Sequence, residues 1–505
     1  TSVVALGDKS NSEIPIFGNQ SPVEALLDLS KNHPDDIVVW CHESLKQHLN
    51  IGAIEGLFNH QKTLLSYNPS TESFLGNAIG YVEESIFIKI NKEIAFPTWQ
   101  MSGAVGAVHA SVINALRDQI VTTDSLDYFL VSLGKLAMPL GLFCYSEPKL
   151  LKPETVAKAS YQPKSGNVFR FVKQHYKPVW VSLLLLNIVY YEKRFPLIAF
   201  LSALFYKRRT LNNSLDAIAI HAVKKYTNKR TVDVIIPTIG RKDFLYDVLC
   251  DLRAQTQLPS SVIIIEQNPM PGSESELDYL TAESWPFAIR HDFIHQSGAC
   301  NSRNIGLDKI TSEWVFLADD DIRFEPDFIQ KAFENIDDMG AKAATFNCIQ
   351  SVDEIVEAAV SQWPFFGSGC SFVLAENLKG SRFLPGYEFG FGEDLDFGMQ
   401  LRNKGCDVIY LPSPTIVHLK APIGGFRTKP VMKWNAETIQ PKPSPTIMLF
   451  KLLHNTKEQH DGYKTTLFFN YYSSQSLKNP ISYYRNFKKQ WRASIYWANQ
   501  LKKAR

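Results

Sequence analysis

Three consecutive carboxylates, Asp319, Asp320 and Asp321, follow directly after an apolar run at residues 314–318. Adjacent anions repel one another, so a chain tolerates them at the end of a strand where a cation or solvent relieves the repulsion. Hard divalent cations such as Mg²⁺ and Mn²⁺ prefer carboxylate and phosphate oxygens, so a metal carrying a diphosphate is one interpretation. The alternative is a solvated acidic turn that caps the next helix, and the triplet alone favours neither.

A second acidic cluster lies further along the chain, where Glu393, Asp394 and Asp396 follow the glycine-rich residues 389–392. Glycines let a loop approach a ligand closely, and these carboxylates stand at the opening of a predicted helix over residues 393–402. Capping needs only one of them, so the cluster indicates a further role. His418 follows two predicted extended segments and could complete a metal site with the triplet, although a lone histidine is more often an ordinary surface or core residue.

The elements that must position these side chains are typical of a parallel sheet. Strands are predicted at residues 232–237, 262–266 and 314–318, because each is a continuous apolar run and helical stretches separate them. Ligands of such sheets bind beyond the carboxyl ends of the strands, where the carboxylates lie. The chain has no glycine fingerprint of dinucleotide binding after the first strand and no P-loop motif, so neither class is supported.

The segment from about residue 231 to residue 421 resembles the inverting family 2 glycosyltransferases with a GT-A fold, because six blocks occur in the family's order. The blocks are residues 232–241, 261–266, 298–306, 319–321, 367–372 and 392–394. His418 falls where many members place a metal-coordinating histidine. Glu266 departs from the pattern, since an aspartate is more usual there. The implied fold is α/β: a Rossmann-like, mixed but mostly parallel sheet with helices on both faces.

The resemblance implies metal-dependent transfer of a sugar from a nucleotide-diphosphate donor to a hydroxyl of a glycan or lipid-linked acceptor in cell-surface polysaccharide synthesis, and a UDP-sugar is the expected donor. Mn²⁺ or Mg²⁺ would neutralise the departing diphosphate, with Asp321, His418 and Asp319 as the ligands. Asp394 is the expected base, and Glu393 is expected to orient the acceptor. The expected contacts to the nucleotide sugar are Pro237, Thr238, Arg241, Glu266, Arg303, Asp319 and Asp320.

Two other functions stay open. A sugar nucleotidyltransferase also combines a Rossmann-like half with acidic metal ligands, but it needs a glycine-rich basic loop after the first strand, which residues 237–242 suggest only faintly. A non-catalytic glycan-binding scaffold is disfavoured, because residues 229–430 keep the charged positions of the family.

The first 155 residues contain a weaker copy of the same pattern. Three segments match later ones in the same order: residues 36–44 match 313–321, 96–106 match 364–372, and 124–134 match 393–402. Such a series is typical of a diverged internal duplication, and chance similarity of strand-turn-helix patterns is the alternative. In this alignment His42, Glu43 and Ser44 replace the three aspartates and Ser125 replaces the base, so this copy is expected to be non-catalytic.

The predicted organisation has four parts: a degenerate GT-A-like α/β domain at 1–155, a helical linker at 156–228, a GT-A catalytic domain at 229–430 and a helical, basic-aromatic region at 431–505. The linker holds two apolar runs, each shorter than the roughly 20 residues that span a bilayer. Their aromatic and basic edges suit a membrane-interface hairpin, and a pair of buried helices is the alternative. The C-terminal region predicts a basic amphipathic helix that binds anionic lipid or packs on the core.

Composition excludes some classes. The 53 basic and 51 acidic residues nearly cancel, so the chain carries no global signal for nucleic acid. The seven cysteines are scattered and suggest neither a zinc site nor a disulfide framework, which fits a reducing compartment. The chain begins at Thr1 rather than Met, so the absence of a signal peptide says little. The expected location is the cytoplasm, with peripheral attachment to the inner face of the cell membrane.

Overall fold

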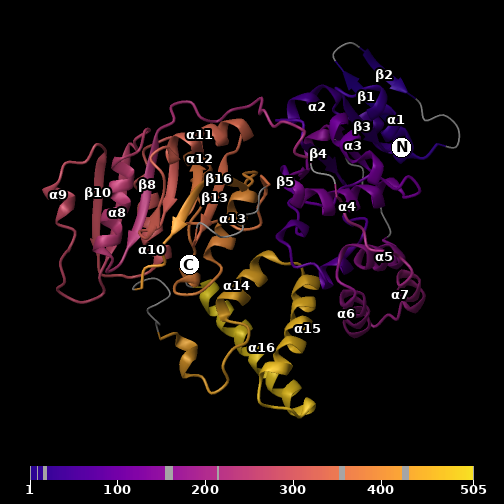
Figure 1. Ribbon diagram of the computed structural model, residues 1–505. Coiled ribbons are helices and arrows are strands. Elements are labelled where there is room, and N and C mark those ends of the chain that lie inside the picture. Colours follow the sequence, from indigo (N-terminus) through magenta and orange to yellow (C-terminus); the bar gives the residue numbers. More distant parts are fainter. Residues whose placement is uncertain are drawn as a thin grey trace. The chain divides into compact units, whose positions relative to one another are not determined.

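The computed structural model describes residues 2–7, 10–14, 20–153, 163–212, 215–351, 359–422 and 431–503. The chain forms two compact units: unit 1 is Thr1–Val223 with Asn455–Ser476, and unit 2 is Lys224–His454 with Leu477–Arg505. Each unit contains one β-sheet (Figure 1). The predicted domain boundaries at residues 155 and 430 lie outside the described residues. Within the described ranges, no helix combines the length and the apolar character needed to cross a bilayer.

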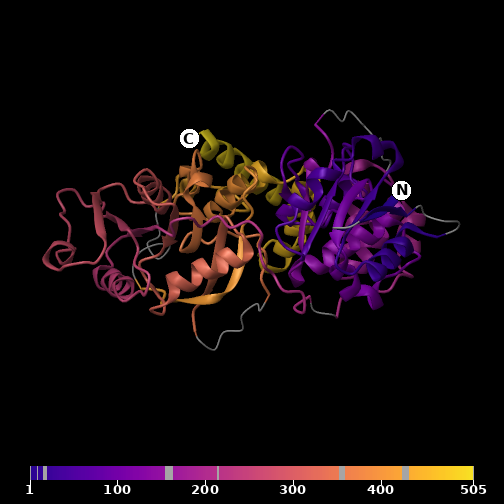
Figure 2. The ribbon, with the colours of Figure 1, turned by 90° about the horizontal axis from the view of Figure 1, so that it is seen from above.

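Unit 2 holds a nine-stranded mixed sheet. Its order is β10 (Ala288–Ile294), β9 (Ser261–Gln267), β8 (Val232–Thr238), β11 (Trp314–Ala318), β15 (Cys370–Leu374), β13 (Ala343–Ile349), β16 (Ile409–His418) and β12 (Ile322–Arg323), with β14 (Ser361–Gln362) paired to β16. β10, β9, β8 and β11 run parallel, and β15 is antiparallel to both of its neighbours. The central strands are buried apolar runs and helices flank the sheet (Figure 2), which confirms the predicted α/β fold.

The order of the strands reverses at β8, since β9 lies on one side of it and β11 on the other. Right-handed crossovers then place α8 (Lys242–Arg253) and α10 (Ala299–Leu307) on opposite faces of the sheet. α10 packs closely on β8, because a Cβ at Gly306 would come within 2.5 Å of Ile235 Cγ2. Ligands bind at such a switch point, beyond the carboxyl ends of β8 and β11.

Helix α13 (Glu393–Arg402) has the predicted bounds. It begins after Gly392, whose φ of 118° is a left-handed conformation that favours glycine. Its inward side chains include Phe397, Met399 and Leu401, all buried. The two extended segments predicted before His418 form the single strand β16, because residues 409–418 pair with β13, β12 and β14 along their length.

The remaining helices of unit 2 are α9 (Tyr279–Ala282), α11 (Phe328–Met339), α12 (Ala375–Leu378), α14 (Pro445–His454) and α16 (Pro480–Lys503). α16 confirms the predicted C-terminal helix, and it packs on α14 within the same unit. Its buried side chains include Tyr483, Phe487 and Trp491, which lie on one face of the helix.

Unit 1 holds a seven-stranded sheet in the order β2 (Ser10–Ile14), β1 (Ser2–Gly7), β3 (Ile37–Cys41), β6 (Val105–His109), β4 (Thr63–Tyr67), β7 (Phe143–Ser146) and β5 (Phe96–Pro97). Its helices are α1 (Pro22–Asn32), α2 (Ile51–Leu57), α3 (Ala110–Leu116), α4 (Leu126–Ala137), α5 (Ser165–His175), α6 (Val179–Asn187), α7 (Leu197–Ala203) and α15 (Lys457–Ser474), with a π-helix at Ile188–Glu192. The N-terminal part is therefore α/β, as predicted, and helices form in the predicted linker.

Five strands of unit 1 repeat the arrangement of five strands of unit 2. The order β3-β6-β4-β7-β5 corresponds to β11-β15-β13-β16-β14, and each set follows the same sequence along the chain. Successive pairs in both sets are antiparallel, antiparallel, parallel and antiparallel. The antiparallel strands β1 and β2 stand where unit 2 has the parallel strands β8 and β9. The shared order supports the predicted duplication.

The strand register agrees with the predicted alignment, whereas the helix starts correct one detail of it. Cys41 pairs with Val105 as Ala318 pairs with Cys370, so His42 does correspond to Asp319. However, Ser125 is the N-cap of α4, as Gly392 is of α13. The second residue of each helix is an aspartate, so Asp127, not Ser125, corresponds to Asp394. The sequence alignment missed this because it matched two acidic stretches without knowing where each helix starts.

Candidate active site

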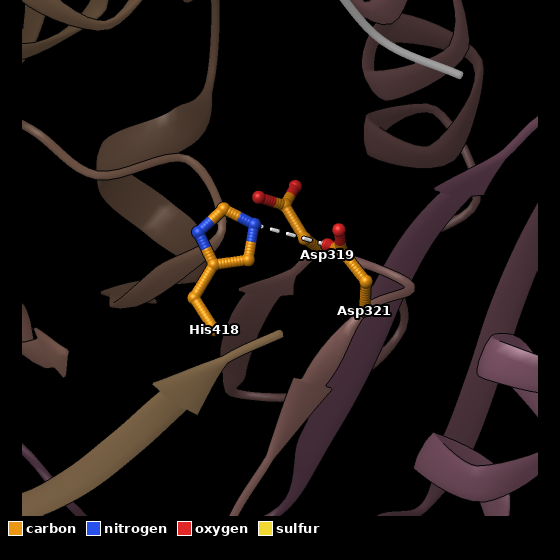
Figure 3. A group of neighbouring side chains, drawn as sticks. All are labelled: Asp319, Asp321 and His418. Carbon is orange, nitrogen blue, oxygen red and sulfur yellow. Dashed lines mark hydrogen bonds and ion pairs between the residues drawn. The ribbon is translucent and has the colours of Figure 1, made fainter. Parts of the chain in front are cut away.

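Asp319, Asp321 and His418 form one group, as the sequence predicts. One ligand atom from each residue lies within 4.8 Å of the others, and the three side chains converge (Figure 3). His418 Nε2 is 3.1 Å from Asp321 Oδ1. The pairing of β12 with β16 sets Ile322 opposite His418, which brings the last residue of β16 beside the aspartates after β11. Two carboxylates and an imidazole are a donor set that Mn²⁺ or Mg²⁺ accepts, so these residues fit a divalent cation.

Asp321 is held as a carboxylate. Burial opposes its charge, yet His418, Arg241 and the backbone N–H of Ala421 together keep its pKa below the usual value. The Ala421 N–H donates to Oδ2 at 2.8 Å, and Arg241 lies 3.3 Å from the same oxygen. The hydrogen bond to Asp321 in turn raises the pKa of His418. Without a cation, the imidazole and the guanidinium therefore supply the positive charge.

Asp320 faces the sheet instead of the metal group. It accepts a hydrogen bond of 2.7 Å from the Thr238 hydroxyl and pairs with Arg241. Burial raises the pKa of Asp320 to about 6, although Arg241 and Thr238 act in the opposite direction. Thr238 ends β8 directly after Pro237, so Asp320 ties the end of β8 to the end of β11. The structure thus brings together Pro237, Thr238, Arg241 and Asp320.

Arg303 lies between the two acidic clusters. The side chain is buried, and its guanidinium donates to Asp319 Oδ1 at 2.9 Å. The charges of Asp394 and Glu393 also act on it, which places the guanidinium near the start of α13. Its Nε has no hydrogen-bond partner among the described residues. Arg303 therefore balances the charge of both clusters and keeps one buried donor available.

Glu388 fixes the helix that carries Arg303. Its carboxylate accepts the backbone N–H groups of Cys300 and Asn301 at 3.0 and 3.1 Å, and so caps α10. A Cβ at Gly298 would come within 2.3 Å of this carboxyl group, so the close approach requires glycine. Sequence reasoning included Gly298 in a motif block but missed Glu388, because nothing local links residues so far apart in the chain.

Glu393 and Asp394 open α13, and both residues are half-buried. Burial raises the pKa of Asp394, while Ser368 donates hydrogen bonds to it through its hydroxyl and its backbone N–H. Burial and the charge of Asp394 raise the pKa of Glu393 to about 7. Asp394 Oδ1 is buried and has no hydrogen-bond partner among the described residues. A buried carboxylate with one unpaired oxygen and a raised pKa is suited to accept a proton from a substrate hydroxyl.

The loop before β15 touches both clusters. Ser368 contacts Asp394, and a Cβ at the next residue, Gly369, would come within 2.2 Å of Asp319 Oδ2. The sequence identified residues 367–372 as a block of the acceptor side without assigning a contact to Ser368. The glycines on either side of Ser368 are the signal that could have indicated a close approach.

Glu266 lies apart from the metal group. It ends β9 and accepts hydrogen bonds from Ser275 at 2.5 Å, from the Glu276 N–H at 3.2 Å and from His291 at 2.9 Å. Burial opposes its charge, but His291 and Ser275 keep the pKa of Glu266 below the usual value. These partners belong to β10 and to the loop after β9, so the carboxylate is fixed at the edge of the switch point.

Asp396 supports α13 from within the fold. It is buried and lies 2.7 Å from His454 Nε2 and from Gln400 Nε2. The sequence grouped Asp396 with Glu393 and Asp394, but Asp396 lies two residues after Asp394, about 200° further round the helix, so these two carboxylates point to nearly opposite sides. His454 was not predicted, because it ends α14 beyond every motif block.

Comparisons with known proteins place part of the chain in a family. Residues 233–385 match the sequence model of the family described as Glycosyl transferase family 2. None of the curated proteins compared with the chain matches it.

Among solved structures, S. aureus TarS is similar at 15% identity with a TM-score of 0.32, over 49% of this chain and 44% of that chain. TarS 1–349 in complex with UDP-GlcNAc is similar at 17% identity with a TM-score of 0.34, over 50% of this chain and 75% of that chain. GalNAc-T7 with UDP, GalNAc and Mn²⁺ is similar at 12% identity with a TM-score of 0.31, over 37% of this chain and 43% of that chain. The chain thus spans less than half the length of TarS.

The family match covers β8, β9, β11 and the three aspartates, whereas Asp394 and His418 lie beyond its end. The matched residues lie within unit 2 and include most of its sheet, and they overlap the motif blocks that carry the resemblance. Residues 233–385 are therefore a domain of glycosyl transferase family 2, with the GT-A fold.

Proposed function

We propose that this protein is a metal-dependent, inverting glycosyltransferase. It moves a sugar from a nucleotide-diphosphate donor, a UDP-sugar above all, to a hydroxyl of a glycan or lipid-linked acceptor. The family match of residues 233–385 supports the class of reaction. The observation that carries the proposal is Asp394, whose buried, unpaired Oδ1 stands at the opening of α13.

Asp319, Asp321 and His418 are the residues that would hold the cation. When bound there, Mn²⁺ or Mg²⁺ supplies positive charge that stabilises the departing diphosphate. Arg241 and Arg303 contact these aspartates at 3.3 and 2.9 Å, so their charges also act on the phosphate side of the site. Thr238 and Asp320 hold the ends of β8 and β11 together, which keeps these groups in place before the donor binds.

Asp394 takes the proton of the acceptor hydroxyl as the oxygen attacks the anomeric carbon. A new carbon–oxygen bond forms on one face while the bond to the diphosphate breaks on the other, so the configuration inverts in one displacement. Glu393, with its pKa raised to about 7, is partly protonated near neutral pH and can donate a hydrogen bond to the acceptor. Ser368 holds Asp394 in the orientation that leaves Oδ1 unpaired.

The proposed acceptor implies a biosynthetic role and a cellular location for the enzyme. A lipid-linked or surface glycan acceptor belongs to cell-surface polysaccharide synthesis. The enzyme would then work at the cytoplasmic face of the cell membrane.

A panel of nucleotide sugars tests the proposal directly. The protein is incubated with UDP-, GDP- and dTDP-sugars in Mn²⁺ or Mg²⁺, and release of the nucleotide is measured with and without EDTA. We expect release from one UDP-sugar, loss of release in EDTA and loss of release in Asp394→Asn. Turnover that EDTA does not affect would exclude the metal dependence, and a panel without any turnover or binding would count against the donor class.

The sugar nucleotidyltransferase alternative is disfavoured by the environment of Arg241. This residue is the basic side chain of the loop after β8, and it contacts Asp320 and Asp321. A triphosphate carries more negative charge than a diphosphate, and Arg241 is already paired with two aspartates. A separate incubation with UTP and a sugar phosphate tests the alternative, because a nucleotidyltransferase would release pyrophosphate.

A further inference from the structure

Large apolar side chains are concentrated on one exposed segment of unit 1. Of the 26 exposed large apolar side chains in the described residues, 11 lie within residues 179–206. This segment, which we call the apolar hairpin, comprises α6, the π-helix and α7. Phe205 is 89% exposed, Ile198 86% and Phe195 65%. Single exposed apolar residues are common, but a concentration of them in one short segment points to an interaction surface.

The apolar hairpin has an ordinary inner face as well. Val181, Leu184, Ile188 and Ala203 are buried in unit 1. A helix that packs on a core normally presents polar side chains on its opposite face. Here the opposite face is also apolar, so core packing explains the buried apolar side chains of the apolar hairpin but not the exposed ones.

Basic residues surround this outer face. Lys177, Lys193, Arg194, Lys207 and Arg208 are exposed at the ends of α6 and α7. Glu192 is the one acidic residue in the sequence from 177 to 208, and it pairs with Arg194. The segment therefore carries a clear positive charge beside its apolar side chains.

The aromatic side chains lie next to these charges. Tyr190 contacts the Lys193 ammonium at 5.1 Å from the ring centroid, and Phe205 and Tyr206 directly precede Lys207. Aromatic and basic side chains at the edge of an apolar surface are the arrangement that binds the boundary between lipid headgroups and acyl chains.

We propose that residues 177–208 are a docking surface for a bilayer that contains anionic lipids. The apolar side chains of α6 and α7 enter the headgroup boundary, and the basic residues contact the anionic headgroups. A second copy of the chain would cover the apolar side chains but would bring five more basic residues against these, so the charge favours lipid. The inference rests on the proposed function only for the membrane-bound acceptor, since docking itself needs no catalysis.

Sedimentation of the full chain with vesicles tests the docking surface. We expect binding to vesicles of phosphatidylcholine with phosphatidylglycerol, and weak binding to phosphatidylcholine alone. Ile198→Ser with Phe205→Ser should weaken binding at least about tenfold, because two large apolar side chains no longer enter the bilayer. Lys207→Gln and Arg208→Gln should each weaken it about fivefold in vesicles with phosphatidylglycerol, and added salt should do the same.

Matched controls come from the same chain. Val223 and Val431 are 80% and 88% exposed and lie outside the apolar hairpin, so Val223→Ser with Val431→Ser should bind vesicles as the wild type does. All substituted residues are exposed, and thermal unfolding should show an unchanged fold. Nucleotide release from the soluble donor should also be unchanged in the apolar variant, which separates docking from transfer.

Three results would overturn the proposal: a wild type that stays in the supernatant with both kinds of vesicle, an apolar variant that binds as the wild type does, or a wild-type dimer that the apolar variant dissociates while neither protein binds lipid. Vesicle binding without any nucleotide release would instead leave docking intact and count against the proposed function.

Discussion

At the scale of single residues, Asp394 combines burial with an incomplete set of hydrogen bonds. Asp394→Asn should lower the transfer rate by about 10²–10⁴-fold, because the amide keeps the shape but cannot accept the proton. Nucleotide-sugar affinity should stay near that of the wild type. Steady-state kinetics and calorimetric titration check both expectations, with the exposed Asp338→Asn as the control. A variant that retains more than about a tenth of the wild-type rate would contradict the assignment.

The metal group gives a second prediction. His418→Ala and Asp321→Ala should each weaken binding of the nucleotide sugar in Mn²⁺, because each removes a ligand of the shared cation. His418 is 31% exposed, so its loss should leave the fold intact, whereas Asp321 is buried and its variant needs a check by thermal unfolding. Titrations with and without EDTA make the measurement. Wild-type binding that is equally tight in EDTA would refute the expectation.

The acidic pair at the start of α13 predicts a pH dependence. Buried carboxylates with raised pKa values gain protons as the pH falls, and the value for Glu393 is about 7. Burial raises the pKa of Asp394 as well, so transfer should decline as the pH falls into the acid range, because the proposed base becomes protonated. Glu393→Gln should move this decline to lower pH, since Asp394 then ionises without a neighbouring charge. Profiles of kcat/KM against pH test this, and an unmoved profile would contradict it.

The raised pKa of Glu393 also determines how the stability of the fold depends on pH. A folded-state pKa above the unfolded value means that the fold binds a proton more tightly than the unfolded chain does. The contribution of Glu393 to stability is thus present at low pH and is lost as the pH rises through about 7. Glu393→Gln should remove this part of the dependence in thermal unfolding curves.

Sequence reasoning found the residues whose types and spacing are characteristic, and missed those that act through tertiary contacts. Asp319, Asp321 and His418 were predicted as one group and the structure brings them together. Ser368 and Glu388 were not assigned roles, because a serine or a glutamate has no local feature that tells which distant backbone or carboxylate it meets.

At the scale of elements, α14 supports α13, the helix that carries the proposed base. His454→Ala should leave Asp396 buried with one donor fewer, which costs about 1–3 kcal/mol. The melting temperature should fall, and the transfer rate should fall more than nucleotide affinity, because α13 is less well fixed. His454→Asn, which keeps a donor, should recover part of both losses. An unchanged melting temperature in His454→Ala would show that the contact does not support α13.

Strands and the catalytic helix were predicted well, because buried apolar runs and a glycine before an acidic helix start are local signals. Only part of the segment 36–44, which the alignment matched to 313–321, is a strand, since β3 ends at Cys41 and His42 caps a 3₁₀ turn by accepting the Ser44 N–H. The continuous strand β16 was divided in the prediction, because prolines at 412 and 414 are usually signals of interruption.

At the scale of the molecule, five described strands of unit 1 repeat five strands of the unit 2 sheet, and the antiparallel strands β1 and β2 stand where unit 2 has the parallel strands β8 and β9. Asp127 is half-buried and accepts the Gly103 N–H at 2.7 Å, as Asp394 accepts that of Ser368. His42 and Glu43 stand in place of two of the aspartates, so we expect Asp127→Asn, and His42→Ala with Glu43→Ala, to leave the rate of the chemical step unchanged. The transfer rates of these variants are measured together with that of Asp394→Asn, which should lose activity. A fall in rate of more than about tenfold in either unit 1 variant would give unit 1 a catalytic role.

The division of the chain into units could not be predicted from sequence. The C-terminal region was expected to be one part, but α15 belongs to unit 1 and α16 to unit 2. Both are helices with buried faces, and a helix sequence does not state which core it covers.

The place of α15 affects the order in which the protein can be completed during synthesis. The Gln459 side chain donates to the backbone carbonyls of Glu83 and Ser85, and a Cβ at Gly462 would come within 2.3 Å of the Tyr81 carbonyl oxygen. Unit 1 therefore cannot complete its fold until the ribosome has made α15, which follows residues 224–454 in the sequence. Unit 1 can begin to fold first, but unit 1 is not the first unit that can complete its fold. Residues 81–85 stay uncovered by α15 while residues 224–454 are synthesised.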